Sequence, residues 1–505
     1  MAGGVLRMKL GFKDYGVEEH WDTDVCVIGA GAGGAATATA LAESGLRVIV
    51  LEAGSHWSPD EFKQDSAWAL RNLYDGRGTR STVGNCVIPV PGGRGVGGST
   101  LINSAICFRT PDAILDDWVD NHGCSRLTKA RMGPLLDRVW ETIGVTVNPV
   151  AFQRNNNLIF KKGADALGLP GDWLPRSAPG CIGCGVCQLG CPTGGKSSVD
   201  RSFLPIALAT GLTQIHADCR VDTAQTNGGR VVTVGGHMVD PTDMKAKGRF
   251  QVTAKAFVSS AGPVGTPRFL LNTGLTDDSV VGQSLYIHPT SGQMARFEEE
   301  IKPWHGVTQG YCVNRWEEGY LLQVYSVSPD QMFMAMPYSL GTRRLEAIRD
   351  LKNMALAGPL VHDEDSTGQV TSSGLMYFLG DEDRKRLLAG IRETCRVFFA
   401  AGAIEVYTGI VGSDPIRRVS DIDAAVKDDI PARDLYLYAS HPMSTVRMGS
   451  DPSRAAVDPD GRVYGWDNLF VADASVFPTS LGVNPQVSTM AIGLTVGASV
   501  AEDLS

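Results

Sequence analysis

The chain has 505 residues, of which 43% are hydrophobic, and its formal net charge is −9. This length allows two or more domains with packed cores, and the acidic balance argues against nucleic acid or an anionic membrane surface as a partner. No stretch approaches the roughly 20 apolar residues of a membrane span, and the opening run MAGGVLRMKLGFKDYG lacks the apolar core of a secretory signal. We therefore expect a loop-rich α/β enzyme of the cytoplasm.

The first recognisable unit is a strand, a glycine-rich turn and a helix. Residues 24–28, DVCVI, form an apolar run typical of a buried parallel strand, and the motif G-x-G-x-x-G follows at Gly29, Gly31 and Gly34. Such glycines let the backbone approach a pyrophosphate, which the N-terminus of the next helix binds. A second strand, RVIVLEAG, ends in Glu52, where an acid hydrogen-bonds the adenosine ribose. The combination predicts a dinucleotide site but leaves FAD and NAD open.

Four later segments narrow that choice. Residues 90–111, VPGGRGVGGSTLINSAICFRTP, contain a second glycine-rich loop that a nicotinamide does not require. Together with GPVGTPRFLLNTGL at 262–275, SHPMSTVRMG at 440–449 and residues 468–493, this loop makes the chain similar to the glucose–methanol–choline (GMC) oxidoreductases. The resemblance implies FAD as the cofactor and an α/β fold, with a Rossmann-like FAD-binding domain and an α+β substrate-binding cap.

The resemblance also implies site residues. In this family a histidine of the third segment and a His or Asn of the fourth flank the reactive face of the flavin, and these correspond to His441 and Asn484. The other positions implied to bind FAD are Gly97, Gly98, Asn103 and Asp473, with Asn484 shared between both roles. For Asp473 a helix N-cap is the competing interpretation, and for Asn484 an Asn-Pro turn. Members with covalently attached flavin carry His where this chain has Ile102, so we expect FAD to be bound without a covalent link.

Alcohol oxidation needs a base beside the hydroxyl group and a donor for the developing alkoxide. It removes a hydride from carbon, which passes to flavin N5, and a proton from oxygen. A neutral imidazole takes the proton, and a side-chain amide donates a hydrogen bond without competing for it. His441 and Asn484 fit these two roles. The chain has nine histidines, and a structural role is the alternative for any one of them. The motif around His441 favours a catalytic role for this residue.

A cysteine run forms the second chemical signal. Cys181, Cys184, Cys187 and Cys191, followed by Pro192, have the spacing C-x2-C-x2-C-x3-C-P of bacterial ferredoxins. This pattern predicts an iron–sulfur cluster, either 4Fe-4S with all four ligands or 3Fe-4S with three. The alternatives are a zinc site, which usually needs a second ligand pair elsewhere, and disulfides or free thiols.

These signals together predict an enzyme that oxidises a small-molecule alcohol with FAD and passes electrons through the cluster to a protein or quinone acceptor. An alcohol oxidase that reduces dioxygen to hydrogen peroxide, with structural cysteines, is the first alternative. A non-catalytic electron-transfer flavoprotein is the second, and it has no need of His441 with Asn484.

The matching segments are discontinuous along the chain. Residues 362–365, HDED, form the only compact acidic run of the middle region, and we expect a solvated hairpin tip there rather than a clamp for a cationic substrate. We expect an FAD-binding domain formed by residues 20–112, 176–290 and 440–505, which includes the cysteine run 181–191. The cap is expected to comprise residues 113–175 and 291–439.

Overall fold

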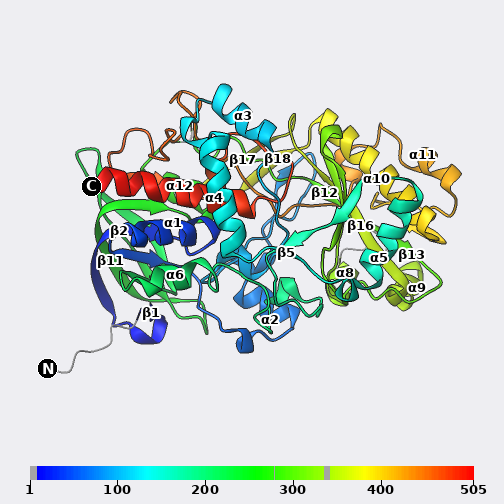
Figure 1. Ribbon diagram of the computed structural model, residues 1–505, viewed down its shortest axis with the longest axis horizontal. Coiled ribbons are helices and arrows are strands. Elements are labelled where there is room, and N and C mark those ends of the chain that lie inside the picture. Colours follow the sequence, from blue (N-terminus) through cyan, green and yellow to red (C-terminus); the bar gives the residue numbers. More distant parts are fainter. Residues whose placement is uncertain (1–7, 278, 335–341) are drawn as a thin grey trace.

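A mostly parallel sheet supports the predicted dinucleotide site in the computed structural model, which describes residues 8–277, 279–334 and 342–505 (Figure 1). At its centre β2 pairs in parallel with β3 on one edge and with β11 on the other. The far edge of β11 has two partners, because β10 pairs antiparallel with its first half and β21 pairs in parallel with residues 257–259. The strands of this sheet are β1 (Lys9–Leu10), β2 (Glu18–Ile28), β3 (Val48–Leu51), β8 (Thr213–His216), β9 (Cys219–Asn227), β10 (Arg230–Val239), β11 (Ala246–Ser259) and β21 (Leu469–Val471).

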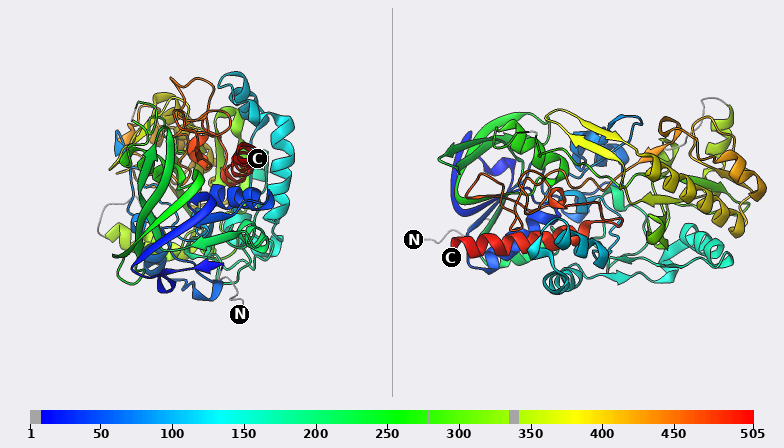
Figure 2. Two further views of the ribbon diagram at one scale, coloured as in Figure 1. Left: turned by 90° about the vertical axis from the view of Figure 1, so that its left-hand side faces the viewer. Right: turned by 90° about the horizontal axis from the view of Figure 1, so that it is seen from above.

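Helices with small residues pack closely on this sheet. A Cβ atom on Gly493 of the last helix would lie 2.4 Å from the carbonyl oxygen of Gly33 in the first, so only glycine permits this approach of the two backbones. The last helix therefore docks directly on the helix that follows the glycine motif (Figure 2). The helices of this half are α1 (Ala32–Glu43), α2 (Ser66–Asn72), α3 (Asp112–Asp120), α4 (Lys129–Thr142), α6 (Phe203–Ala209), α7 (Gly262–Asn272) and α12 (Gln486–Leu504).

An antiparallel sheet forms the other half of the molecule, and helices α5 and α10 pack on it (Figure 1). Its strands run in the order β19-β13-β16-β15-β14-β6, with β12 beside β16 and β20. The predicted fold class, a Rossmann-type sheet with an α+β cap, is thus confirmed. The elements are β6 (Gly171–Trp173), β12 (Thr290–Ser291), β13 (Gln293–Arg296), β14 (Tyr311–Arg315), β15 (Tyr320–Val324), β16 (Met354–Val361), β19 (Glu405–Tyr407), β20 (Leu437–Tyr438), α5 (Val150–Ala166), α8 (Pro329–Met334), α9 (Thr342–Arg349), α10 (Asp381–Ala401) and α11 (Ile422–Ala425).

Two small sheets lie between these halves. One pairs β17 with β18 and β18 with β4, and the other pairs β5 with β7, which leads into the cysteine run. Among the helices of the described ranges, none combines the length and the apolar character needed to cross a bilayer. The bounds are β4 (Val83–Gly84), β5 (Thr146–Val147), β7 (Pro175–Arg176), β17 (Thr367–Val370) and β18 (Leu375–Phe378).

The segment 113–175 divides between the two cores. Its first part, with α3 and α4, buries Trp118, Met132 and Val139 in the core around the parallel sheet, whereas the sequence pattern predicts the whole segment as part of the cap. Only its second part, with Phe160 of α5, packs in the core of the cap. The reason is that α4 lies against α12 of the first half.

Candidate active site

The two glycine-rich loops meet where the dinucleotide site was predicted. Gly29 has a φ of 108°, a conformation that side chains other than glycine rarely adopt, at the turn from β2 into α1. A Cβ atom on Gly98 would lie 2.7 Å from the Cα atom of Gly31, so the second loop touches the first backbone to backbone. No side chain caps the N-terminus of α1, which leaves its helix dipole and first N–H groups directed at this junction.

Glu52 ties both loops together. One carboxylate oxygen accepts hydrogen bonds from the backbone N–H groups of Gly54 (2.9 Å) and Gly95 (3.1 Å), and the other accepts one from Ala30 (3.0 Å). Burial raises the pKa of this carboxyl group. The acid is therefore held at the carboxyl end of β3 by both glycine-rich loops, and its hydrogen bond to the adenosine ribose stays a prediction.

Asn103 and Asp473 are also brought to this region, but their polar groups already have partners. The Asn103 amide donates to Gln486 at the start of α12 (2.9 Å). The Asp473 carboxylate is buried and accepts hydrogen bonds from Ser475 N (2.7 Å), Gly262 N (2.9 Å) and Thr266 Oγ1 (2.6 Å). Asp473 is thus the N-cap of the short helix that follows, which was the competing interpretation, and its contact with the flavin stays a prediction.

His441 and Asn484 lie side by side at the junction of the two halves. The amide of Asn484 is 3.2 Å from His441 Nε2, and Asn484 also bonds to Gln323 of the cap sheet at 2.8 Å. The residue is partly exposed, and burial of its imidazole group lowers the pKa to about 4. The ring is therefore neutral at physiological pH, as an acid–base group for a hydroxyl proton must be at the start of the reaction.

A second histidine, which sequence reasoning missed, touches the first. His288 Nδ1 lies 3.3 Å from His441 Nδ1, and His288 Nε2 accepts a hydrogen bond of 2.9 Å from the backbone N–H of Gly482. His288 is fully buried and has a φ of 52°, which is uncommon outside glycine. The only sequence signal is a histidine that ends the apolar run LYI before a proline.

The carboxylate of Asp363 holds His288 in this conformation. Its two oxygens accept from Ile287 N (2.7 Å), His288 N (3.3 Å), Ser480 Oγ (2.7 Å) and Tyr377 OH (3.1 Å). Asp363 is 1% exposed. The expectation of a solvated hairpin tip at 362–365 is therefore wrong for its first two residues, because donors from the chain before and after it surround this carboxylate.

The four cysteines of the run line one shared pocket with Lys196. Backbone N–H groups point at two of the sulfurs, from Gly183 to Cys181 Sγ (3.4 Å) and from Lys196 to Cys191 Sγ (3.3 Å). All the cysteines are free, so the disulfide alternative finds no support. In the described part of the chain no three His, Cys, Asp or Glu side chains come together as the ligands of one metal ion, and the predicted cluster is not confirmed.

Two buried cations stand beside these sulfurs. Arg176 is 0% exposed and its guanidinium group lies 3.6 Å from Cys181 Sγ and 3.4 Å from Cys187 Sγ. Lys196 is 2% exposed, and its ammonium group donates to the carbonyl oxygens of Leu101 (2.8 Å), Asn103 (2.9 Å) and Cys187 (3.1 Å). Against the effect of burial, these two charges lower the pKa of the Cys187 thiol. The donor set fits a thiolate-bound anionic cluster, because buried cations need a counter-charge.

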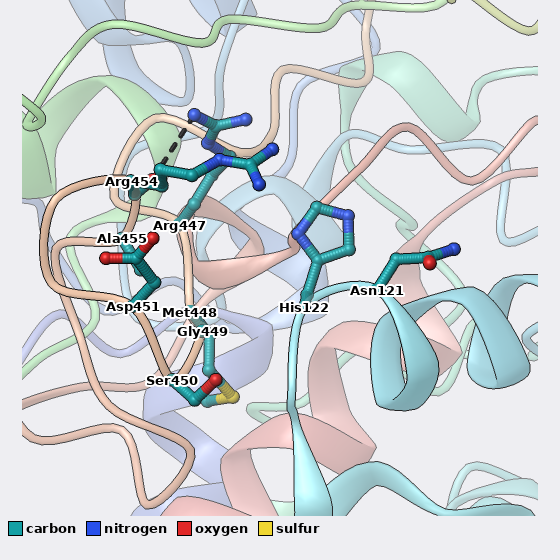
Figure 3. Close-up of a pocket in the computed structure, with 9 residues that line it drawn as sticks. All are labelled: Asn121, His122, Arg447, Met448, Gly449, Ser450, Asp451, Arg454 and Ala455. Carbon is teal, nitrogen blue, oxygen red and sulfur yellow. Dashed lines mark hydrogen bonds between the residues drawn. The ribbon is translucent and has the colours of Figure 1, made fainter.

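Another small pocket lies on the loop after His441 (Figure 3). The guanidinium groups of Arg447 and Arg454 lie next to each other there, and the ring of His122 faces them. Arg447 donates to the carbonyl oxygen of Arg454 at 3.3 Å, and burial lowers its pKa. None of the predicted site residues lines this pocket.

Comparison with known proteins agrees with this architecture. Residues 70–290 and 361–493 match the two models of the GMC oxidoreductases, and residues 24–76 match the model of the FAD dependent oxidoreductases. An uncharacterized GMC-type oxidoreductase of Mycobacterium tuberculosis is 34% identical over 94% of this chain and 75% of its own length. A long-chain-alcohol oxidase of Arabidopsis thaliana is 28% identical over 95% of this chain and 67% of its own.

The fold recurs in solved structures of low sequence identity. The pyridoxine 4-oxidase of Mesorbium loti superposes with a TM-score of 0.72 at 18% identity, over 94% of this chain and 98% of that one. The family models, together with the fold and the dinucleotide site, define a flavoprotein oxidoreductase that uses FAD. The chain belongs to the GMC oxidoreductase family.

Proposed function

We propose that the protein oxidises the CH–OH group of an alcohol to an aldehyde or ketone with FAD. The observation that carries the proposal is the contact between His441 and Asn484 at the junction of the FAD-binding half and the cap. FAD, when bound along the two glycine loops, supplies the hydride acceptor at its N5 atom. Gly29, Gly31 and Gly34, with Gly97 and Gly98, are the backbone positions that would hold it.

The protein's own groups then handle the hydroxyl oxygen. Asn484 is fixed by Gln323 from the cap sheet, so its amide is oriented before a substrate arrives. His441 is the group proposed to take the hydroxyl proton. A positioned acid–base group of this kind contributes roughly 10²–10⁴-fold to a rate.

We propose further that Cys181, Cys184, Cys187 and Cys191 bind an iron–sulfur cluster that passes electrons one at a time to a protein or quinone acceptor. The shared pocket, the N–H groups directed at sulfur and the buried charges of Arg176 and Lys196 support this assignment. In a cube each thiolate binds a different iron, so the sulfurs stand farther apart than four ligands of one zinc ion. Lys196 also joins the cysteine loop to Asn103 of the flavin segment.

An alcohol oxidase that reduces dioxygen is the second candidate. The relatives named as long-chain-alcohol oxidases favour it, and the cysteines are then structural. A long-chain alcohol is the first substrate to try on the same ground. A purely electron-transferring flavoprotein has no use for the pair His441 and Asn484.

Flavin bleaching by a panel of alcohols under argon tests the proposal. We expect at least one alcohol to bleach the wild-type flavin, and the His441→Ala variant to do so roughly 10²–10⁴-fold more slowly with FAD still bound. His122→Ala, a histidine of the other pocket, serves as the control with the wild-type rate. Bleaching of the His441 variant at the wild-type rate would remove this residue from the mechanism. Faster turnover with a one-electron dye than with dioxygen separates the dehydrogenase from the oxidase.

A further inference from the structure

The buried histidine pair has a defined direction of hydrogen bonding. A neutral imidazole carries one N–H and one acceptor nitrogen. The backbone N–H of Gly482 can only donate, so the Nε2 atom of His288 at 2.9 Å must be the acceptor. The single proton of His288 therefore lies on Nδ1, where the ring nitrogen of His441 at 3.3 Å is its partner.

The surroundings keep His288 neutral, which this argument requires. Its ring is fully buried, and its titratable neighbours are His441, His362 and Asp363. Burial and the two histidines hold the pKa of His288 well below its ordinary value. Asp363 bonds to the backbone N–H of His288 and to no atom of its ring, so no carboxylate favours an imidazolium there.

The same order of donor and acceptor extends from His288 to the proposed catalytic pair, His441 and Asn484. Since His288 Nδ1–H donates to His441 Nδ1, the proton of neutral His441 lies on Nε2. The structure has Asn484 Nδ2 at 3.2 Å from His441 Nε2 and Gln323 Nε2 donating to Asn484 Oδ1. The tautomer with the proton on Nε2 requires both amides to turn, so that Asn484 Oδ1 accepts from His441 and Gln323 Oε1 accepts from the NH₂ group of Asn484. An amide side chain provides either group after a half-turn of its last torsion angle.

We propose that His288 is a positioning residue that fixes the resting tautomer of His441, with the proton on Nε2 at the substrate edge; this inference rests on the proposed function. In this resting tautomer the single N–H of His441 points to Asn484, so His441 is not yet the base of the proposed function. It can accept a hydroxyl proton at Nε2 only from the opposite tautomer, in which the Nε2–H of His288 would face the N–H of Gly482. The tautomer of His441 that can act as a base is therefore disfavoured by the backbone N–H of Gly482, two residues before Asn484.

Neutron diffraction from crystals of the oxidised enzyme in D₂O tests the tautomer directly. We expect deuterium on His441 Nε2 and on His288 Nδ1. Deuterium on His441 Nδ1 with none on Nε2 would overturn the proposal. The measurement does not depend on turnover, so it is independent of the proposed function.

Substitution of His288 supplies a second, functional test. In His288→Asp the new carboxylate can only accept, which forces the proton of His441 onto Nδ1 and stabilises its imidazolium form. An opposite charge at this distance raises a pKa by 1–3 units, so flavin reduction at pH 5 should fall by about tenfold and recover as the pH rises. The wild-type rate should be nearly flat over the same range. His288→Asn, which tolerates a positive φ and carries no charge, keeps the flat profile.

The control and the opposite outcomes keep the two proposals apart. His122→Asn changes a histidine of the pocket on the loop after His441, which lies beside Asp117, and should leave the profile flat. A flat profile in folded, FAD-loaded His288→Asp would refute the role of His288 while His441→Ala remains slow. A fast His441→Ala enzyme would refute the proposed function instead, whatever the tautomer.

Discussion

Replacement of Asp363 by asparagine tests whether one buried carboxylate holds the loop of His288. The carboxylate accepts from two backbone N–H groups, one on each oxygen, and from two hydroxyl groups. An asparagine has one oxygen, and its NH₂ group must replace the other. The hydroxyls of Ser480 and Tyr377 can turn and accept from it, but one backbone N–H cannot.

The structure indicates which bond is lost. The bond to Ile287 N is 2.7 Å long and the bond to His288 N is 3.3 Å long, so the amide should turn its NH₂ toward His288. The change leaves a buried N–H without a partner and removes one bond to a charged group, which costs about 1.5–3 kcal/mol. A displaced His288 also loses its alignment with His441, and a shift of about 1 Å at a site can cost 10²-fold in rate.

Thermal unfolding and anaerobic flavin reduction measure the two effects. We expect the unfolding midpoint of Asp363→Asn to fall by several degrees and flavin reduction to slow by about 10–100-fold. Tyr377→Phe removes only one hydroxyl donor and is the matched control with the smaller change. An Asp363→Asn enzyme with the wild-type midpoint and rate would show that this carboxylate does not position the site.

Four other outcomes follow from the same geometry. Gly98→Ala should weaken FAD binding, measured as the flavin to protein ratio after gel filtration, because its Cβ would lie 2.7 Å from the Cα of Gly31; full FAD content would contradict the contact. Acid precipitation should release the FAD into the supernatant, since Ile102 offers no attachment, and a yellow pellet would disagree. Asn484→Ala should slow flavin reduction less than His441→Ala, because it removes a hydrogen bond and not the acid–base group; the reverse order would exchange their roles. Anaerobically purified protein should contain about three or four irons per chain, and Cys184→Ser should lose the brown absorbance; zinc in their place would exclude the cluster.

The sequence predicted the elements that recur with fixed spacing. The glycine motif with Glu52 follows from one local segment whose spacing is set by a strand, a turn and a helix, whereas two separate segments contain His441 and Asn484. The structure brings the last two together although 43 residues separate them. The prediction that these two residues share one site came from the family resemblance, because no local sequence pattern relates a His-Pro segment to an Asn-Pro segment.

The remaining site residues could not be found from local pattern. Asp363 stands in an acidic run that is typical of a solvated face, and its burial depends on donors from three other places in the chain. Arg176 and Lys196 are ordinary cations in sequence, and only the fold sets them against the cysteine sulfurs. Residues 113–147 could not be assigned to a domain because amphipathic spacing predicts a buried helix face but does not specify which core that face packs against.

The shared edge of β11 has a consequence for the order in which the protein can mature. Its last residues are paired by β21 near the end of the chain, and the same C-terminal segment contributes Asp473, Asn484 and the helix that covers α1. Domains usually fold from the N-terminal side during synthesis, yet here the ribosome must reach residue 471 before the sheet has the strand that pairs with the end of β11. We therefore expect FAD to load only after α12 has been synthesised, because a chain that stops before α12 lacks the helix that packs on α1.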